Sequence, residues 1–335
     1  MRPPMASGAA AIETASRWPK WLLFVAYGAM LGMVPVSYWI GEAVGPFASQ
    51  QSALVKEHLA SGTLLTCPFT ALHIGVWVVL VVLVQPLVLV GGLMLVERAF
   101  GFRGDGNWRL AWLVRAFYFA LVYLIGLLYF RWFEFTPDPL LAPTFADQPA
   151  PLRIGGTIAV VIVSLLLSDL LQYWLHRAFH RYPALWRLHS VHHSPRRLSV
   201  LYNIVHPAEA WIAIILNLLI VKSLIVVNPA DVWLLVALMG LQNHFVHMNV
   251  PIHFGRFRAV LVDNRFHFLH HSRADEDRDC NFAAWFPVLD RLFGTYRSPR
   301  TDELCETGVK DRLPPATLQD YFLARLPPER PTGSP

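Results

Sequence analysis

Long apolar runs, separated by short polar or basic segments, dominate the first half of the chain. Four of these runs are long enough to cross a bilayer as a helix, which takes about 20 residues. They occupy residues 22–40, 72–96, 110–130 and 154–175. The first run lacks the small-residue cleavage site of a signal peptide, so we expect it to be a transmembrane helix.

Two further apolar segments, residues 208–227 and 232–245, are joined by the short sequence NPAD. Asn-Pro opens turns, and Asp231 is a favoured residue at a helix N-cap. A joint this short predicts an antiparallel helical hairpin whose two ends return to the same side of the membrane. From residue 251 onward the chain is basic and has the composition of a soluble segment.

The composition agrees with a membrane protein. Only 15% of the residues are charged and 55% are hydrophobic, whereas a soluble domain carries about 25% charged residues. The net charge is +5, but no nucleic-acid-binding motif accompanies it, so we expect no nucleic-acid partner. Lys and Arg gather in the N-terminal segment, in residues 97–109 and in residues 176–200, which predicts that these segments and both termini are cytoplasmic.

The pattern therefore predicts an all-α integral membrane protein. It would have four transmembrane helices, a helical hairpin and a cytoplasmic histidine-rich cap. We divide the chain into an N-terminal membrane region at residues 1–153, a histidine-rich region at 154–300 and a C-terminal tail at 301–335.

Histidines form three tight groups after the fourth apolar run. An HxxxH and an HxxHH come first, a pair follows, and a second HxxHH comes last: His176, His180, His189, His192, His193, His244, His247, His267, His270 and His271. Residues three and four apart share one helix face, so each group can direct its imidazoles at one point. Neutral imidazole is the commonest nitrogen ligand of transition metals.

Ten imidazoles are too many for one metal ion, since a closed structural zinc site takes four ligands. The pattern predicts two metal ions with about five nitrogens each. Because no Asp or Glu lies within the groups, bridging carboxylates of the ferritin type are not indicated. Iron, copper and zinc all suit nitrogen ligands, and composition does not choose among them.

Asp169 lies inside the fourth apolar run, seven residues before His176 and close to the same helix face. A carboxylate inside a membrane segment is a candidate functional group. We expect Asp169 to accept a hydrogen bond from a ligand histidine, and we place Asn249 in the same supporting layer. The alternative is an Asp at a helix end that pairs with a nearby arginine.

Five motifs resemble the fatty acid hydroxylase / sterol desaturase superfamily of integral-membrane di-iron enzymes. They are DLLQYWLHRAFH (169–180), HSVHH (189–193), FVHMN (245–249), FHFLHH (266–271) and DCNFAAWFPVLDRLFGTY (279–296). Together they cover about the half of the chain between residues 169 and 296. The combination is far more specific than any single HxxHH.

The resemblance implies that residues 154–300 form a di-iron catalytic region in which the ten histidines hold two iron ions. It implies O₂ as co-substrate and the hydroxylation or desaturation of a C–H bond in a sterol, fatty-acyl or ether lipid drawn from the bilayer. The chain has no HPGG haem loop, no GxGxxG and no cysteine set for an iron–sulfur cluster. We therefore expect a separate electron-donor protein, which an arginine-rich cytoplasmic rim could receive (Arg187, Arg196, Arg197, Arg273 and Arg278).

Two other hypotheses remain open. A histidine-rich metal transporter would place its ligands near the bilayer midplane, whereas these histidines lie at helix ends and in cytoplasmic segments. A non-catalytic family member could keep the metal site for structure alone, although all ten ligand positions are occupied.

Overall fold

The computed structural model describes residue 61 and residues 85–100, 107–132, 149–224, 229–250, 254–299 and 305–329. Within these ranges the chain is helical, with two isolated β-bridges and no strand. The predicted span at residues 22–40, most of the one at 72–96 and residues 225–228 of the hairpin lie outside the described residues. The described helices are α4 (Gln85–Ala99), α5 (Trp108–Trp132), α6 (Ala150–Arg181), α7 (Pro183–His193), α8 (Pro207–Leu224), α9 (Pro229–His247), η3 (Gly255–Ala259), α10 (Asn264–His270), η4 (Asp275–Asp277), α11 (Val288–Leu292) and α12 (Leu318–Phe322).

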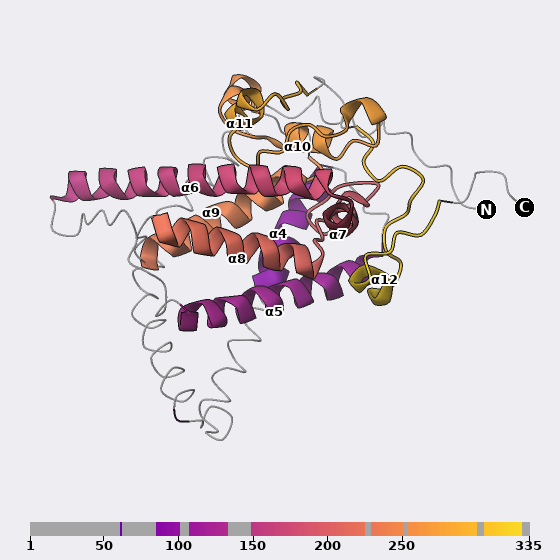
Figure 1. The fold of residues 1–335 in the computed structure, drawn as a ribbon, viewed down its shortest axis with the longest axis horizontal. Helices are drawn as coiled ribbons and strands as arrows, with labels where there is room; N and C mark the ends of the chain where they lie inside the picture. The colour runs from indigo at the N-terminus through magenta and orange to yellow at the C-terminus, as the bar shows by residue number, and fades with distance from the viewer. Residues whose placement is uncertain are drawn as a thin grey trace, which may run out of the picture.

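Helix α6 is the long helix against which α7, α8 and α9 pack (Figure 1). It runs for 32 residues from a proline-containing first turn, where a missing N–H costs nothing. It ends at Tyr182, whose backbone is extended (φ −101°, ψ 122°). The cause is Pro183, because a residue that precedes proline is disfavoured in the helical region. Pro183 then begins α7, so the chain turns a corner between His180 and His189.

The two faces of α6 differ in exposure. Among the described residues, Ile158–Arg181 is the one stretch long and apolar enough to cross a bilayer, with a mean hydropathy of 2.0. Ile158, Ile162 and Leu166 form an exposed apolar stripe at a spacing of four residues, whereas Val161 and Leu165 are buried. An exposed apolar stripe of this kind suits contact with lipid. The count of four membrane helices and their orientation stay predictions.

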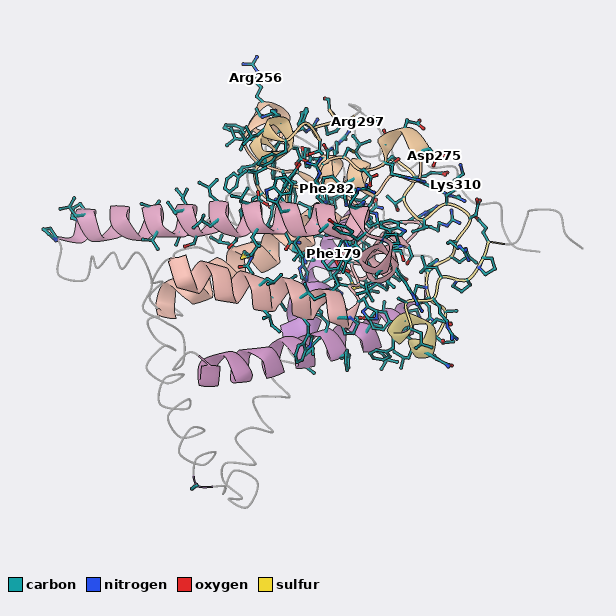
Figure 2. The ribbon with its side chains drawn as sticks, in the orientation of Figure 1. Phe179, Arg256, Asp275, Phe282, Arg297 and Lys310 are labelled. Atoms are coloured by element: carbon teal, nitrogen blue, oxygen red, sulfur yellow. The ribbon has the colours of Figure 1, made fainter. Side chains whose placement is uncertain are left out.

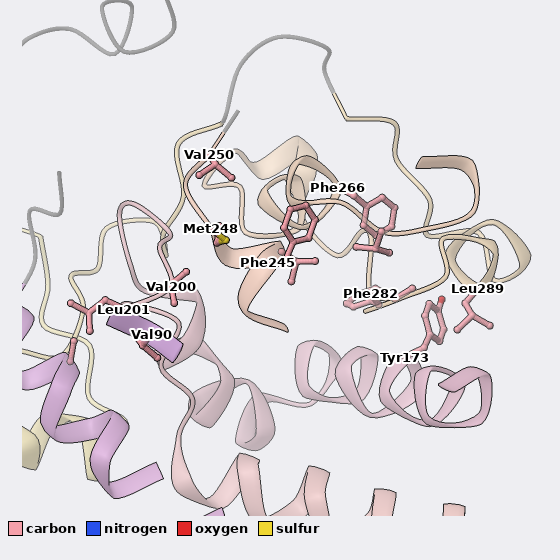
Figure 3. Packing of buried hydrophobic residues seen from close by; sticks show 14 residues of the cluster. Val90, Tyr173, Val200, Leu201, Phe245, Met248, Val250, Phe266, Phe282 and Leu289 are labelled. Carbon is pink, nitrogen blue, oxygen red and sulfur yellow. The ribbon is translucent and has the colours of Figure 1, made fainter. Parts of the chain in front are cut away.

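Both segments of the predicted hairpin are helical, as α8 and α9. They pack on α6, while α5 packs on α8 and α10 packs on α9 (Figure 1). The largest apolar cluster joins α6 to the chain around α10 and α11. Tyr173 of α6 contacts Phe282 edge-on in this cluster, with 6.0 Å between ring centroids, and Phe266 and Leu289 are buried nearby (Figure 3). The cluster fixes the end of α6 against α10.

Two buried charges hold the irregular segment between α7 and α8. The Glu97 carboxylate accepts hydrogen bonds from the backbone N–H groups of Val200 (3.0 Å) and Asn249 (2.8 Å). The Arg115 guanidinium donates to the carbonyls of Val200, Leu201 and Asn203. Since buried backbone groups need partners, these two side chains let a non-helical segment lie beside the histidines.

Candidate metal centre

The described structure brings nine of the ten predicted histidines into two buried groups. In each group the ligand nitrogens all lie within 4.8 Å of one another. The first group holds five imidazoles: His176, His180, His189, His193 and His270. The second group holds four: His192, His247, His267 and His271. The groups adjoin where the rings of His193 and His271 stack with their centroids 4.2 Å apart.

Four elements supply these side chains, and helical spacing explains how each element contributes. His176 and His180 are four residues apart on α6, and α7 presents three histidines from its second half. His247 ends α9, and the second HxxHH forms the end of α10, with His271 at its C-cap. The Asp263 carboxylate caps the start of α10 by accepting from the Phe266 N–H (3.0 Å). Helix ends on rigid supports therefore converge on one place.

Hydrogen bonds fix most of the rings through their Nδ1 atoms. In the first group, Nδ1 of His176 donates to the Phe282 carbonyl (3.0 Å), and Nδ1 of His270 donates to the Cys280 carbonyl (2.7 Å). In the second group, His192 and His247 donate in the same way to the carbonyls of Ile204 (3.2 Å) and Asn243 (2.6 Å). A carbonyl only accepts, so each of these rings carries its proton on Nδ1 and an unprotonated lone pair on Nε2.

The lone pairs face one another. Nε2 of His176 lies 3.0 Å from Nε2 of His189, and Nε2 of His247 lies 3.2 Å from Nε2 of His192. Because Nδ1 of His192 and Nδ1 of His247 both donate to carbonyls, the facing Nε2 atoms of this second pair have no proton to share. Nε2 of His270 is also buried without a hydrogen-bond partner. Two lone pairs at this distance repel unless a cation lies between them.

The donor set fits metal ions. Imidazole nitrogens bound at about 2.1 Å to one ion lie roughly 3.0–4.2 Å apart, and the observed separations between neighbouring Nε2 atoms run from 2.9 to 3.2 Å. Burial, followed by repulsion from neighbouring histidines, holds the pKa of His189, His193, His270 and His271 well below its usual value. Burial lowers the pKa of His192 to about 4. Neutral rings are the form that binds metal.

His244 lies outside both groups. Its Nδ1 donates to the Gly240 carbonyl (2.8 Å), and its Nε2 lies 3.4 Å from Nη1 of Arg115. Arg115 is a permanent donor, so the Nε2 lone pair of His244 accepts from it. His244 and His247 are three residues apart on α9, which separates their directions by about 60°. Only His247 points into the second group.

The two residues expected to support the ligands make other contacts. The Asp169 carboxylate accepts from the backbone N–H groups of Ala284 (2.8 Å), Trp285 (3.2 Å) and Phe286 (2.7 Å), and among the described residues no histidine donates to it. Asn249 donates from its side chain to the Leu198 carbonyl (3.1 Å). Both side chains therefore hold irregular backbone next to the site, not the imidazoles themselves.

Glu209, on the first turn of α8, is a buried carboxylate that does contact one of these histidines. Its Oε1 accepts from Nδ1 of His189 at 2.6 Å, and its side chain is 9% exposed. A second carboxylate, Asp279, accepts from His180 (3.1 Å) but is 57% exposed. The sequence alone assigns Glu209 no role, because nothing local links it to His189, twenty residues earlier. One local feature of the sequence could have drawn attention to Glu209: it is an acidic residue in the first turn of a helix, directly after His206 and Pro207.

The comparison with protein families agrees with this geometry. The fatty acid hydroxylase family model matches residues 161–295, a range that contains every histidine of the two groups. Residues 161–295 are therefore similar to the fatty acid hydroxylase family. The resemblance found from the sequence motifs is confirmed over this range, which runs from the middle of α6 to α11.

Several relatives of this chain have the names of enzymes that act on lipids or long-chain aldehydes. Ornithine lipid hydroxylase OlsE of Rhizobium tropici is 27% identical over 50% of this chain and 49% of its own length. Alkylglycerol monooxygenase of Danio rerio is 28% identical over 41% of this chain and 30% of its own length. Very-long-chain aldehyde decarbonylase GL1-7 of Oryza sativa subsp. japonica is 24% identical over 56% of this chain and 30% of its own length. The chain thus spans about half the length of these relatives or less, and no solved structure matches it.

Replacing Glu209 by Ala is expected to weaken metal binding at the two histidine groups. The buried Nδ1–H of His189 would lose its acceptor, and partners of this kind typically contribute 10–100-fold to metal affinity or activity, so we expect a loss of about that size. Glu209→Gln keeps an acceptor oxygen but loses the charge, so its loss is expected to be smaller. Titration of metal-loaded protein with a chelator measures the affinity. Equal affinity in Glu209→Ala and the unaltered protein would contradict this role.

Proposed function

We propose that this protein is a membrane-bound di-iron oxygenase that hydroxylates, or desaturates, a C–H bond of a lipid with O₂ and external electrons. The observation that carries the proposal is the pair of buried imidazole groups whose Nε2 atoms face one another. The match of these residues to the fatty acid hydroxylase family supports iron over copper or zinc. The similarity to a lipid hydroxylase and an alkylglycerol monooxygenase supports a lipid substrate.

The residues of the chain have separate tasks in this proposal. The five-histidine group and the four-histidine group would each hold one iron, and the carbonyls and Glu209 keep the rings oriented. When bound, the irons supply the capacity to activate O₂ for attack on an unactivated C–H bond. The four-histidine group has one imidazole fewer, which favours it as the side that faces the substrate. Burial of all but one of the nine histidines excludes water from the reaction.

Electrons would come from a separate protein. In hydroxylation the C–H bond supplies two of the four electrons that reduce O₂, and a donor supplies the other two. The predicted arginine rim offers an electron donor fewer unpaired positive charges than the sequence suggests, because three of its five arginines form ion pairs. Arg196 and Arg273 both contact Glu329 (2.5 Å each), and Arg278 contacts Asp275 (2.9 Å). The donor's docking site is therefore not assigned to these arginines.

The transporter hypothesis is less well supported by the geometry. Transport needs ligands that release a metal along a path, whereas the described groups are closed by fixed ring orientations on four helices. A non-catalytic role predicts the same metal site without turnover. An activity experiment therefore distinguishes that role from the oxygenase.

The decisive experiment compares lipids from a strain that lacks this gene with lipids from the same strain carrying it, grown under ¹⁸O₂. We expect one lipid class to gain an oxygen atom that carries the ¹⁸O label, or to lose two hydrogens without label if the reaction is desaturation. A His192→Ala variant is the matched control and should leave the lipids unchanged. An unchanged lipid profile in the strain with the intact gene would contradict the proposal, and a shortened hydrocarbon would instead indicate decarbonylation.

A further inference from the structure

The segment at residues 282–286 is irregular backbone that lies alongside the apolar part of α6. The side chains of Trp285 and Phe286 pack against Val161 and Leu165 of that helix. Asp169, which binds this segment, lies twelve residues before Arg181, or about 18 Å along the helix axis. If Ile158–Arg181 crosses the bilayer, this segment lies at membrane depth and not in the cytoplasm.

Irregular backbone at membrane depth is tolerated only where its polar groups are satisfied within the protein. Every N–H from residue 282 to 286 has a buried carboxylate as acceptor. Asp290 accepts from Phe282 (2.7 Å) and Ala283 (2.9 Å), and Asp169 accepts from the next three. Both aspartates are at most 1% exposed.

Four of the five carbonyls of this segment also have a donor within the protein, including that of Phe286, which accepts from the Leu289 N–H (3.1 Å). Gln242 of α9 donates to the Ala284 carbonyl (3.1 Å), and the Val262 N–H donates to the Trp285 carbonyl (2.8 Å). The Phe282 carbonyl accepts from His176. A loop on a cytoplasmic surface has water for these bonds, so such extensive internal pairing favours insertion into lipid.

Large apolar side chains point outward around the segment. Val288 and Leu292 of α11 are 52% and 71% exposed, and Phe257 and Val260 at η3 are 65% and 60% exposed. The two short helices are joined, because Nη1 of Arg291 donates to the Ala259 carbonyl (2.7 Å). Their four apolar side chains form what we call the α11–η3 patch.

Arginines border the α11–η3 patch. Arg256 extends away from the body of the molecule beside α11 (Figure 2), and the Arg291 guanidinium lies 4.5 Å from the centroid of the Tyr296 ring. Apolar side chains flanked by arginine and aromatic residues are typical of the interface between acyl chains and phosphate headgroups. Charge and polarity therefore fit a phospholipid surface.

We propose that α11, η3 and residues 282–286 form a wedge that inserts into the bilayer beside α6, with the α11–η3 patch against acyl chains and Arg256 at the phosphates. The chain after residue 251, which has a soluble composition, then lies partly in the membrane. The wedge carries the carbonyl that orients His176, so it brings the first histidine group to the edge of the lipid phase. This inference rests on the membrane placement of α6 and not on the proposed reaction.

Cysteine accessibility in nanodiscs that hold one purified copy tests the wedge. Cys67 and Cys305 are first replaced by Ser, and the buried Cys280 is kept. Leu292→Cys is the test variant, Leu318→Cys on α12 is the water-facing control, and Ile162→Cys on the α6 stripe is the lipid-facing control. Each replaced residue is at least 40% exposed, so the substitutions remove little packing. Reaction with a charged maleimide needs a hydrated thiolate.

We expect Leu292→Cys to react roughly tenfold more slowly than Leu318→Cys, and as slowly as Ile162→Cys, because lipid disfavours the thiolate. All three should react alike after unfolding in SDS. A bimane fluorophore on Cys at 292 should also be quenched by phospholipids with brominated acyl chains, which separates contact with lipid from contact with protein.

Two outcomes would overturn the wedge. One is labelling of Leu292→Cys at the rate of Leu318→Cys without bromine quenching, while Ile162→Cys stays protected. In that case α6 spans the membrane but the wedge does not enter it. The other is fast labelling of Ile162→Cys as well, in which case the membrane placement of α6 fails too. Neither outcome depends on metal content or turnover, so the proposed function is tested separately.

Discussion

Replacing His271 by Ala is expected to remove one of the two metal ions and to abolish turnover. His271 is fully buried at the C-cap of α10, and its Nε2 lies 3.1 Å from Nε2 of His267. Its ring also stacks on His193 of the other group. The four-histidine group would fall to three imidazoles, and we expect turnover to drop by more than about a hundredfold, beyond the usual cost of losing an outer hydrogen-bond partner.

The measurement is metal per chain by elemental analysis, together with turnover on the lipid identified by ¹⁸O labelling. His206→Ala is the matched control. That histidine is also buried, but it lies outside both groups, where its Nε2 donates to the Phe322 carbonyl (3.2 Å). We expect His206→Ala to keep two metal ions per chain. If His271→Ala keeps both metal ions and full turnover, His271 is not a ligand.

The same measurement on His244→Ala decides between two predictions. The sequence predicts His244 as a tenth ligand, which requires loss of metal in this variant. The contact of its Nε2 with Arg115 predicts that both metal ions stay, because that lone pair is already engaged. The spacing of the motif did not contain this information, since Arg115 lies more than a hundred residues away in the chain.

The pattern of apolar residues predicted the positions of the described helices better than it predicted where they end. The apolar run that ends at residue 175 continues as helix α6 to Arg181, because polar residues after the run keep the helical backbone until Pro183 ends it. Histidines four residues apart do stay together, as His176 with His180, His189 with His193, and His267 with His271. Their partition into groups was not predictable, since His189 and His192 of α7 belong to different groups. That partition depends on the corner at Tyr182 and on how α7 packs.

Long-range partners account for the rest of the difference. Asp169 is a polar residue in an apolar run, and the sequence marks it as special for that reason. Its partners are backbone groups more than a hundred residues later, which no pattern of side chains reveals. Glu209, by contrast, does not stand out in the sequence, because an acidic residue in the first turn of a helix is common. Only the fold places it beside His189.

Replacing Asp169 by Ala is expected to destabilise the protein strongly and to cost the first metal group its ion as a consequence. Three buried N–H groups would lose their acceptor, and an unsatisfied buried donor costs about 1–3 kcal/mol. We therefore expect a loss of at least about 3 kcal/mol, which corresponds to a fall in melting temperature of roughly 6–12 °C. Metal would follow because the freed segment carries the Phe282 carbonyl that orients His176.

Thermal unfolding in detergent, read alongside metal content, checks this expectation with two graded controls. Asp169→Asn keeps one carbonyl oxygen and should fall between Ala and the unaltered protein. Ser168→Ala removes a neighbouring buried side chain with one hydrogen bond, to Asn217 (3.3 Å), and should cost about 1 kcal/mol. A direct role on a ligand histidine makes the contrary prediction, namely weaker metal binding with an unchanged melting temperature. That result would show that the carboxylate acts on the metal centre and not on the segment, because only loss of the backbone acceptors lowers the stability of the metal-free protein.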